Sequence, residues 1–290
     1  MMLIFPKIWK GLVRMAKFVM PKNEREFRDE IYDEKSVIMA GGTDLLVKMR
    51  IGKINPSKIV STLRVPTFHA LGFDGKELII GANVTYSELL DFEPIKKEFP
   101  ILYDAIYSIG SPQIRNRATL AGNLINASPA GDGLLALYLL DAEVELSNGK
   151  RYSVGEFVRG PGQTILEHKE YVKSIIIRKE EWTHRYFEKV GQRNSMTISI
   201  ASMGSLFKID NGKIREMRIA FGSVGPTVLR MREIEEFARD KELDENLIRE
   251  ISIMAYNDVR PIDDVRGSAE YRRRLCRNLI YRFNYILERS

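Results

Sequence analysis

The strongest constraint on the fold comes from three pairs of Asp or Asn followed by Gly, each of which lies between two runs of strand-forming residues. The pairs are Asp74-Gly75, Asn148-Gly149 and Asn211-Gly212. Such pairs are typical of two-residue β-hairpin turns, in which both turn residues need positive φ. The sequence therefore predicts abundant antiparallel strands, which argues against a purely doubly wound parallel fold.

Helical segments are expected between and after these hairpins. Residues 36–40 form a short apolar run that ends at two glycines, and residues 44–50 then show a helical pattern. Three more helices are predicted near the C-terminus, over residues 233–240, 244–258 and 268–288. Because 290 residues exceed a typical single domain, we expect two or three compact units. The combination of antiparallel hairpins with helices predicts an α+β fold.

The content of cysteine and histidine restricts the chemistry of this chain. Cys276 is the only cysteine, and the three histidines are far apart in sequence. A disulfide, a zinc site or an iron–sulfur cluster therefore cannot be built from this chain alone. Any chemistry must use an organic cofactor, carboxylates or a partner chain. The cysteine usage fits a reducing compartment, so a cytoplasmic location is expected.

The charge pattern does not favour a nucleic-acid binder. The chain has 45 Lys and Arg against 39 Asp and Glu, a formal net charge of +6, with the two signs mixed along the sequence. Nucleic-acid binders usually concentrate positive charge on one face. The one dense basic stretch, residues 271–277, is interpreted as the solvated side of a helix. No apolar run approaches the length of a transmembrane helix.

The first 17 residues are basic and apolar and lack a small-residue cleavage pattern, so we interpret residues 1–17 as an N-terminal extension rather than a secretory signal. An amphipathic segment that lies on a membrane or a partner is one alternative. A true start at Met15 or Met20 is another.

A first glycine-bearing segment is Ala40-Gly-Gly-Thr-Asp-Leu-Leu. Two glycines between a strand and a helix let several backbone N–H groups converge on one point, which favours a bound phosphate or pyrophosphate. Thr43 offers a hydroxyl donor, and Asp44 can cap the helix. The alternative is that the glycines end the strand for steric reasons alone. The segment is neither a Rossmann fingerprint nor a P-loop.

A second segment, residues 109–132, is dense in Gly, Asn, Ser and Pro and is too long for a simple turn. We interpret it as a functional loop. Its donors and hydroxyls suit a ligand with phosphates and ribose hydroxyls, and its one carboxylate, Asp132, opens an apolar helix. The alternative is a structural loop in which Asp132 caps that helix.

Together, the first segment and Arg117-Ala-Thr-Leu-Ala-Gly-Asn resemble the two FAD-binding signatures of the medium subunit of molybdenum hydroxylases, the family of xanthine dehydrogenase and aerobic carbon monoxide dehydrogenase. Three stretches of the C-terminal half agree with that family's closing domain. They begin at Tyr186, Arg218 and Ser268. The resemblance covers roughly residues 18–288.

The resemblance implies an FAD-binding domain of the vanillyl-alcohol oxidase (PCMH) type over residues 18–178, in two α+β subdomains of about 18–66 and 67–178. A C-terminal domain of the CO dehydrogenase flavoprotein type would follow over residues 179–290. That domain is expected to have a small sheet of three antiparallel strands together with helices.

The resemblance also implies the residues that contact FAD. One group would line the adenosine-diphosphate part, with the amides of Gly41 to Thr43 on the pyrophosphate: Ile38, Met39, Ala40, Gly41, Gly42, Thr43, Asp44 and Leu45. Thr119, Gly122 and Asn123 would continue that contact. Asp132 would bind a ribitol or ribose hydroxyl. Ile165 and Lys189 would lie near the isoalloxazine.

Several features qualify this assignment. Lys189 could stabilise the negative charge of reduced flavin; the alternative is a surface lysine. No general base is assigned. The family usually has two adjacent glycines before Asn123, where this chain has Ala121 and Gly122, and the added methyl is tolerable at negative φ. Because no cysteine or histidine stands beside the first glycine turn, the FAD should be non-covalent.

The implied function is electron relay between partner subunits. A large subunit would carry molybdopterin, a small one two [2Fe–2S] clusters, and the FAD here would pass electrons to NAD, quinone, ferredoxin or oxygen. The alternatives are a free-standing FAD-dependent oxidoreductase and a scaffold subunit that has lost FAD. The substrate is not readable from the sequence.

Overall fold

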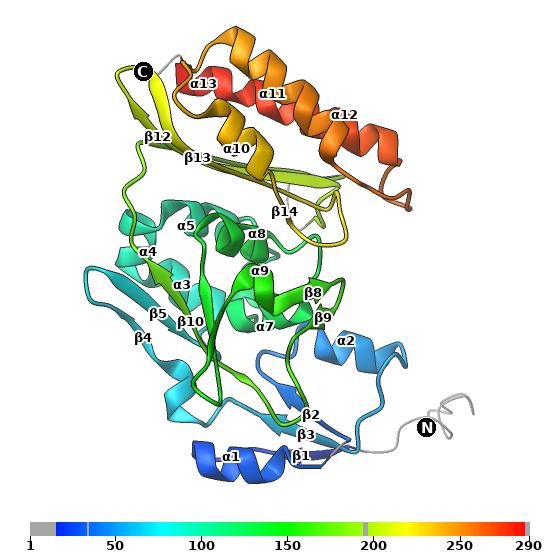
Figure 1. Cartoon of the computed structure of the whole chain (residues 1–290). Helices are drawn as coiled ribbons and strands as arrows, with labels where there is room; N and C mark the ends of the chain where they lie inside the picture. The colour runs from blue at the N-terminus through cyan, green and yellow to red at the C-terminus, as the bar shows by residue number, and fades with distance from the viewer. Residues whose placement is uncertain (1–15, 34, 194–196, 288–290) are drawn as a thin grey trace.

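The computed structural model describes residues 16–33, 35–193 and 197–287, arranged in three tiers (Figure 1). A three-stranded sheet lies at the bottom, a five-stranded sheet with most of the helices in the middle, and a four-stranded sheet under three helices at the top. The N-terminal extension predicted for residues 1–17 falls outside the described residues as far as residue 15.

The bottom sheet is parallel, with strand order β1-β3-β2. Its strands are β1 (Lys17–Val19), β2 (Ser36–Met39) and β3 (Lys58–Ser61). Parallel neighbours need crossover connections, and these contain α1 (Glu24–Glu30) and α2 (Leu45–Arg50). The predicted order of strand, glycine turn and helix is therefore correct for β2 and α2.

The middle tier is an antiparallel sheet of order β4-β5-β10-β6-β7 packed against helices. Its apolar core includes Leu78, Ile80, Leu102, Leu135 and Ile175. The strands are β4 (Leu71–Phe73), β5 (Glu77–Gly81), β6 (Glu143–Leu146), β7 (Arg151–Ser153) and β10 (Val172–Arg178), and β8 (Val158–Gly160) pairs separately with β9 (Gln163–Thr164). The helices are η2 (Pro66–His69), α3 (Tyr86–Asp91), α4 (Glu93–Glu98), α5 (Pro100–Tyr107), α6 (Pro112–Arg115), α7 (Leu120–Asn126), α8 (Asp132–Leu139) and α9 (Val154–Phe157).

The top tier is an antiparallel sheet of order β11-β12-β13-β14. Its strands are β11 (His184–Val190), β12 (Ala201–Asp210), β13 (Lys213–Gly222) and β14 (Leu229–Arg230), and its helices are α10 (Arg232–Ala238), α11 (Glu245–Asp258), α12 (Ala269–Ile280), η3 (Tyr281–Phe283) and α13 (Asn284–Leu287). One face of the sheet carries α10–α12, and α8 of the middle tier contacts the strands β12 and β13 (Figure 1).

Two predictions for this tier need correction. The sheet has a fourth strand, because β14 adds two residues to the predicted three strands. A strand of two residues is too short to show a periodic pattern. The helix predicted over residues 268–288 is interrupted by the 3-10 turn η3, where Phe283 is buried against Phe207 of the sheet.

The three predicted hairpins are confirmed, but their turns differ. Only Asn211-Gly212 has positive φ at both positions, with values of 50° and 74°. In the other two turns, only the glycine has positive φ. There the Asp74 carboxylate accepts hydrogen bonds from the N–H groups of Lys76 and Glu77, and the Asn148 side chain accepts one from Lys150. These side chains stabilise the turn without a left-handed residue at their own position.

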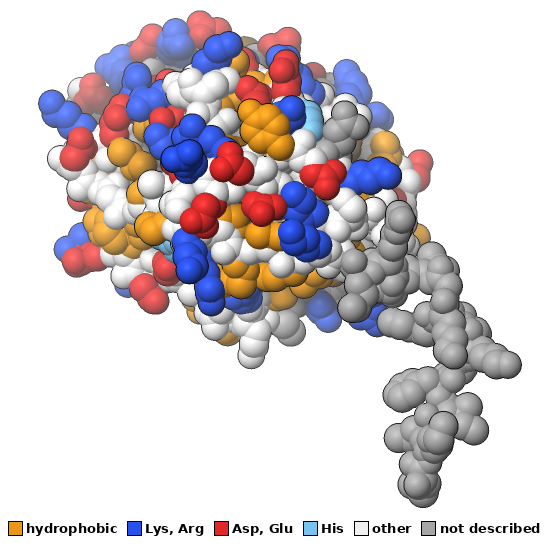
Figure 2. All heavy atoms as spheres, turned by 90° about the horizontal axis from the view of Figure 1, so that it is seen from below, with side chains coloured by type: hydrophobic (Ala, Val, Ile, Leu, Met, Phe, Trp, Pro, Cys, Tyr) orange, Lys and Arg blue, Asp and Glu red, His pale blue; other side chains and the backbone are white. Residues whose placement is uncertain are grey.

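The basic stretch at residues 271–277 lies on α12 but is not entirely solvated. Arg272 is 2% exposed, donates to the carbonyls of Ile200 and Ser223, and pairs with Asp264. Seen from below, positive and negative side chains are interspersed (Figure 2). Among the described residues, no helix is long and apolar enough to cross a membrane.

Candidate functional site

A cavity of about 550 Å³ brings the two glycine-bearing segments together. Its wall comes from all three tiers, through the end of β2, the start of α2, helices α6 to α8 and strand β11. Cavities that hold drug-sized ligands and cofactors are commonly 300–1,000 Å³ in volume. All the residues predicted to contact FAD line this cavity, with the single exception of Ile165.

Gly41 lets the two segments approach one another closely. A Cβ atom added at this position would lie 1.7 Å from the carbonyl oxygen of Arg117, which belongs to the second segment. Gly42 follows with φ of +79°, a conformation that L side chains rarely adopt. Gly41 thus allows the close approach, and Gly42 allows the left-handed backbone conformation. Together they bring the backbone of residues 41–43 to the cavity wall.

The second segment is helical rather than a loop, which corrects the sequence interpretation. It contains α6 and α7, and each helix begins at a capping hydroxyl. Ser111 Oγ accepts from the N–H of Ile114, and Thr119 Oγ1 accepts from the N–H of Gly122 at 2.9 Å. Ala121 lies within α7 and is not among the residues with positive φ, so its methyl group is accommodated.

Neither the predicted cap Asp44 nor Asp132, which the alternative interpretation made a cap, forms a capping hydrogen bond. Asp44 stands at the N-cap of α2, but its side chain makes no capping hydrogen bond. Asp132 is the first residue of α8, whose N-cap is Gly131. Both carboxylates line the cavity instead.

Asp132 and Lys189 form a buried ion pair that joins α8 to β11. Lys189 Nζ lies 2.6 Å from Asp132 Oδ2, and the two side chains are 10% and 4% exposed. The alternative of a surface lysine is therefore wrong. Burial raises the pKa of Asp132, and the attraction of Lys189 partly offsets that effect. Lys189 also donates to the carbonyl of Ser108 at 3.3 Å, and Ser199 Oγ lies 3.4 Å from Asp132 Oδ1.

The pair retains bonding capacity toward the cavity. An ammonium group has three donors, and two of those of Lys189 are used by Asp132 and Ser108. A carboxylate offers about four lone-pair sites, so Asp132 can still accept from a ligand hydroxyl. Since the two charges compensate each other, Lys189 presents the positive end of a dipole to the cavity and not an isolated cation.

The assignment of Ile165 is displaced by one residue. Leu166 lines the cavity, whereas Ile165 packs against the core of the middle tier. Neighbouring residues in an extended segment point to opposite sides, so an error of one position moves the side chain off the wall.

Sequence reasoning missed several residues of the wall. Lys48 Nζ bonds Asn126 Oδ1 at 2.5 Å and so links α2 to α7. Tyr86 and Tyr171 are both buried at the wall. The hydroxyl of Tyr86 has no hydrogen-bond partner among the described residues. Of these residues, only Tyr86 lies beside a recognisable sequence pattern, the capping box of Thr85 and Glu88 that marks the start of α3.

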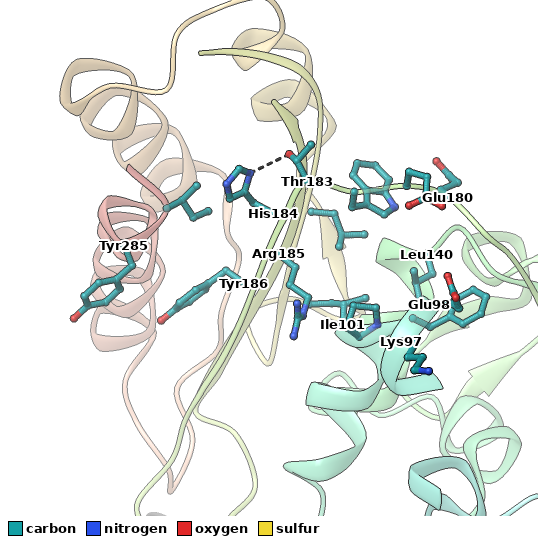
Figure 3. Close-up of a pocket in the computed structure, with 16 residues that line it drawn as sticks. Lys97, Glu98, Ile101, Leu140, Glu180, Thr183, His184, Arg185, Tyr186 and Tyr285 are labelled. Carbon is teal, nitrogen blue, oxygen red and sulfur yellow. Dashed lines mark hydrogen bonds between the residues drawn. The ribbon is translucent and has the colours of Figure 1, made fainter. Parts of the chain in front are cut away.

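A second cavity, of about 490 Å³, lies between the helices α4 and α5 on one side and β11 and α13 on the other (Figure 3). It contains none of the predicted FAD contacts. Its charged side chains are paired in several places: Lys179 contacts Glu98 and Glu181, and Arg185 contacts Asp104. Among the described residues, no group of three or more His, Cys, Asp or Glu side chains could hold a metal ion. The first cavity is therefore the candidate cofactor site.

Two family models match the chain over almost its whole length. The model described as the FAD binding domain in molybdopterin dehydrogenase matches residues 15–179. The model described as the CO dehydrogenase flavoprotein C-terminal domain matches residues 185–287.

Similar curated proteins are named as subunits of dehydrogenases. A xanthine dehydrogenase FAD-binding subunit of Escherichia coli O157:H7 is 30% identical over 250 residues, which covers 83% of this chain and 85% of the relative. A glyceraldehyde dehydrogenase medium chain of Sulfolobus acidocaldarius is 27% identical, and the match covers 83% of this chain and 86% of the relative.

Solved structures match in fold. A chain of the carbon monoxide dehydrogenase of Hydrogenophaga pseudoflava superposes with a TM-score of 0.87 at 23% identity, and the match covers 92% of this chain and 95% of that one. A chain of quinoline 2-oxidoreductase from Pseudomonas putida 86 gives 0.88 at 23% identity, with 92% and 94% covered. The α+β fold class expected from the sequence is confirmed.

Proposed function

We propose a role in electron transfer for this chain, which belongs to the family of FAD-binding subunits of molybdopterin-dependent dehydrogenases. In this role it takes electrons from a [2Fe–2S] partner subunit and passes them to an external acceptor. FAD binding and membership of an oxidoreductase complex follow from the family itself. The observation that carries the proposal further is the cavity in which both glycine segments and the buried Lys189–Asp132 pair meet.

The residues of the wall fit FAD. The close approach at Gly41 and the positive φ of Gly42 bring the backbone of this turn to the cavity wall, where its N–H groups would meet a pyrophosphate. The proposed contacts are therefore Ile38 to Leu45, Thr119, Gly122, Asn123, Asp132 and Lys189, with Leu166 in place of Ile165. The binding would be non-covalent, because Thr43 and Asp44 stand where the wider fold can carry a tethering residue.

The protein's contribution to electron transfer would be orientation and electrostatics. When bound, FAD supplies the exchange between single-electron and two-electron carriers. Asp132 would accept a hydrogen bond from a ribityl or ribose hydroxyl, and the remaining N–H of Lys189 would point to the ligand. No general base is needed, and none is assigned.

The partners are proposed from the names of the relatives. These proteins are called FAD-binding subunits or medium chains of dehydrogenases, which supports a larger molybdopterin subunit and a smaller [2Fe–2S] subunit. The acceptor is proposed as NAD, quinone, ferredoxin or oxygen. The family matches support a domain division at about residue 178. The single cysteine supports a cytoplasmic location.

The test is purification of the tagged full chain from its native cells, with measurement of FAD, molybdenum and iron in the eluted peak. All three should co-elute with two further polypeptides, and the complex should reduce an external dye when its substrate is added. The matched variant, Gly41→Ala, should retain molybdenum and iron, lose FAD, and lose dye reduction.

Two outcomes would contradict the proposal. A chain that elutes with flavin but without molybdenum and iron, and that reduces the dye alone, would be a free-standing oxidoreductase. A chain that elutes with both metals but without flavin would be a scaffold subunit.

A further inference from the structure

Tyr86 has a buried hydroxyl group that the protein leaves without a partner. The residue opens α3, is 1% exposed, and lines the cavity between the two glycine segments. Its backbone N–H donates to the carbonyl of Ala118 at 2.9 Å, which fixes its position beside the second segment. Among the described residues, its hydroxyl oxygen makes no hydrogen bond. A buried polar group in a native structure normally has one.

In the described part of the chain, no neighbouring acceptor takes a hydrogen bond from this hydroxyl. A Cβ atom added at Gly133 would lie 3.1 Å from the Tyr86 hydroxyl and 3.1 Å from Asn123 Oδ1, so both groups face the start of α8. Asn123 Oδ1 already accepts from the N–H of Leu134 at 3.0 Å. Burial, with the charges of Asp132 and Asp44, raises the pKa of Tyr86 well above its ordinary value. The phenol therefore stays protonated and remains a donor.

A second tyrosine of the same wall shows the opposite arrangement. Tyr171 is 3% exposed. Its hydroxyl donates to Glu24 Oε1 at 2.7 Å and accepts from Arg28 Nε at 3.1 Å. Among the described residues, the Tyr171 hydroxyl therefore has both a donor and an acceptor as partners, whereas the buried Tyr86 hydroxyl has neither.

We propose that Tyr86 donates a hydrogen bond to an oxygen of the phosphate–ribityl chain of FAD. This inference rests on the proposed occupation of the cavity by FAD. The oxygen-rich part of that cofactor is the stretch that would pass between the Gly41–Gly42 turn and the start of α8, where the Tyr86 hydroxyl lies. Tyr86 is then a binding residue: the hydrogen bond that its hydroxyl donates to the cofactor offsets the free-energy cost of burying that hydroxyl.

The experiment compares Tyr86→Phe with Tyr171→Phe in the purified full chain. Each substitution removes one oxygen atom and keeps the ring. Tyr86→Phe should weaken FAD binding by about tenfold to a hundredfold. The melting temperature of its FAD-free form should be unchanged or higher, because an unpaired polar group is removed. Tyr171→Phe should lower the melting temperature of the FAD-free form, because it leaves Glu24 and Arg28 without their shared hydroxyl partner.

Titrations with ADP and with riboflavin distinguish the two oxygen sources. Weaker ADP binding by Tyr86→Phe assigns the acceptor to the phosphates, and weaker riboflavin binding assigns it to the ribityl chain; either result supports the inference. Unchanged affinity for FAD, ADP and riboflavin would overturn it and leave the proposed function intact. A wild-type chain that takes up no FAD would contradict the proposed function and this inference together.

Discussion

Two ion pairs of this molecule, one fully buried and one partly buried, have the same length and different surroundings. Lys189–Asp132 lies at the cavity wall, and Arg272–Asp264 lies in the C-terminal tier; both have an N–O distance of 2.6 Å. The terminal nitrogens of Arg272 also bond the carbonyls of Ile200 and Ser223. Asp264 accepts further bonds from the side chain and backbone of Arg266.

The difference lies in where the remaining bonding capacity is placed, because Arg272 Nε, which has no partner among the described residues, is buried in the protein and does not line the cavity. The groups of the C-terminal pair are directed into the protein, where they tie the loop before α12 to the ends of β12 and β13. Counting only partners in the described ranges, the cavity pair has one unused donor on Lys189 and unused lone pairs on Asp132. A buried charge pair with unused capacity facing a cavity indicates a ligand site, whereas a pair with bonds to the surrounding backbone indicates a structural role.

The largest effect is expected from Arg272→Ala, which breaks the structural pair. It removes one of the two arginine partners of Asp264 and leaves the carbonyls of Ile200 and Ser223 without this donor, so the free energy of unfolding should fall by about 2–4 kcal/mol. Urea unfolding measures this. The control is Arg274→Ala on the same helix, whose 64% exposed side chain pairs with Glu270; its effect should stay within about 0.5 kcal/mol. Equal effects for the two variants would remove the structural role assigned to Arg272.

A smaller effect, of opposite sign for the two partners, is expected at the cavity pair. Lys189→Met leaves an uncompensated carboxylate beside the cofactor and should lower the midpoint potential of the flavin. Asp132→Asn leaves an uncompensated ammonium group and should raise it. Shifts of about 30 mV, equivalent to about 1.4 kcal/mol for two electrons, are expected in a spectroelectrochemical titration. Shifts of the same sign would contradict the description of the pair as a compensated dipole near the ring.

The smallest effect concerns pH. Burial alone would raise the pKa of Asp264, but hydrogen bonds from Arg266 and Arg272 outweigh it and hold that pKa well below its usual range. Its contribution to stability is therefore present above about pH 4 and is lost as the pH falls through the lower folded pKa. Burial raises the pKa of Asp132, so its contribution is present below about pH 4 and is lost as the pH rises through the raised value.

Urea unfolding of the FAD-free chain between about pH 3 and pH 7 measures both contributions. Asp264→Asn should reduce the decrease in the free energy of unfolding as the pH falls. Asp132→Asn should reduce a smaller decrease in that free energy as the pH rises. An unchanged pH dependence in the Asp264→Asn variant would show that Arg266 and Arg272 do not stabilise its charged form.

Much of the fold was predictable from local chemistry. The Asp-Gly and Asn-Gly pairs predicted three hairpins because turn residues act through contacts of a few neighbours. The same reasoning misjudged two of the turns, where a side chain of Asp74 or Asn148 replaces positive φ. The composition of residues 109–132 predicts a loop, because Ser111 and Thr119 act as helix caps only in the folded segment.

The candidate site was predictable where it is made of backbone and less so where it is made of side chains. The adjacent glycines Gly41 and Gly42 indicate, from the sequence alone, that another part of the backbone approaches this turn closely. The burial of Arg272, the pairing of Lys189 with Asp132 and the open hydroxyl of Tyr86 depend on contacts across 8 to 72 residues of sequence or on the absence of such contacts. Spacing along the chain carries no information about these.

The most direct test of the central claim, that the cavity between the two glycine segments holds non-covalent FAD, is the visible absorbance of the purified chain before and after acid precipitation. The wild-type chain should show the two bands of flavin, and the colour should move to the supernatant. Gly72→Ala, where an added Cβ atom would meet nothing within 4 Å and φ is not positive, should look the same, and folded Gly41→Ala should be colourless. A folded Gly41→Ala chain that keeps its flavin, or a wild-type chain that takes up none, would contradict the account.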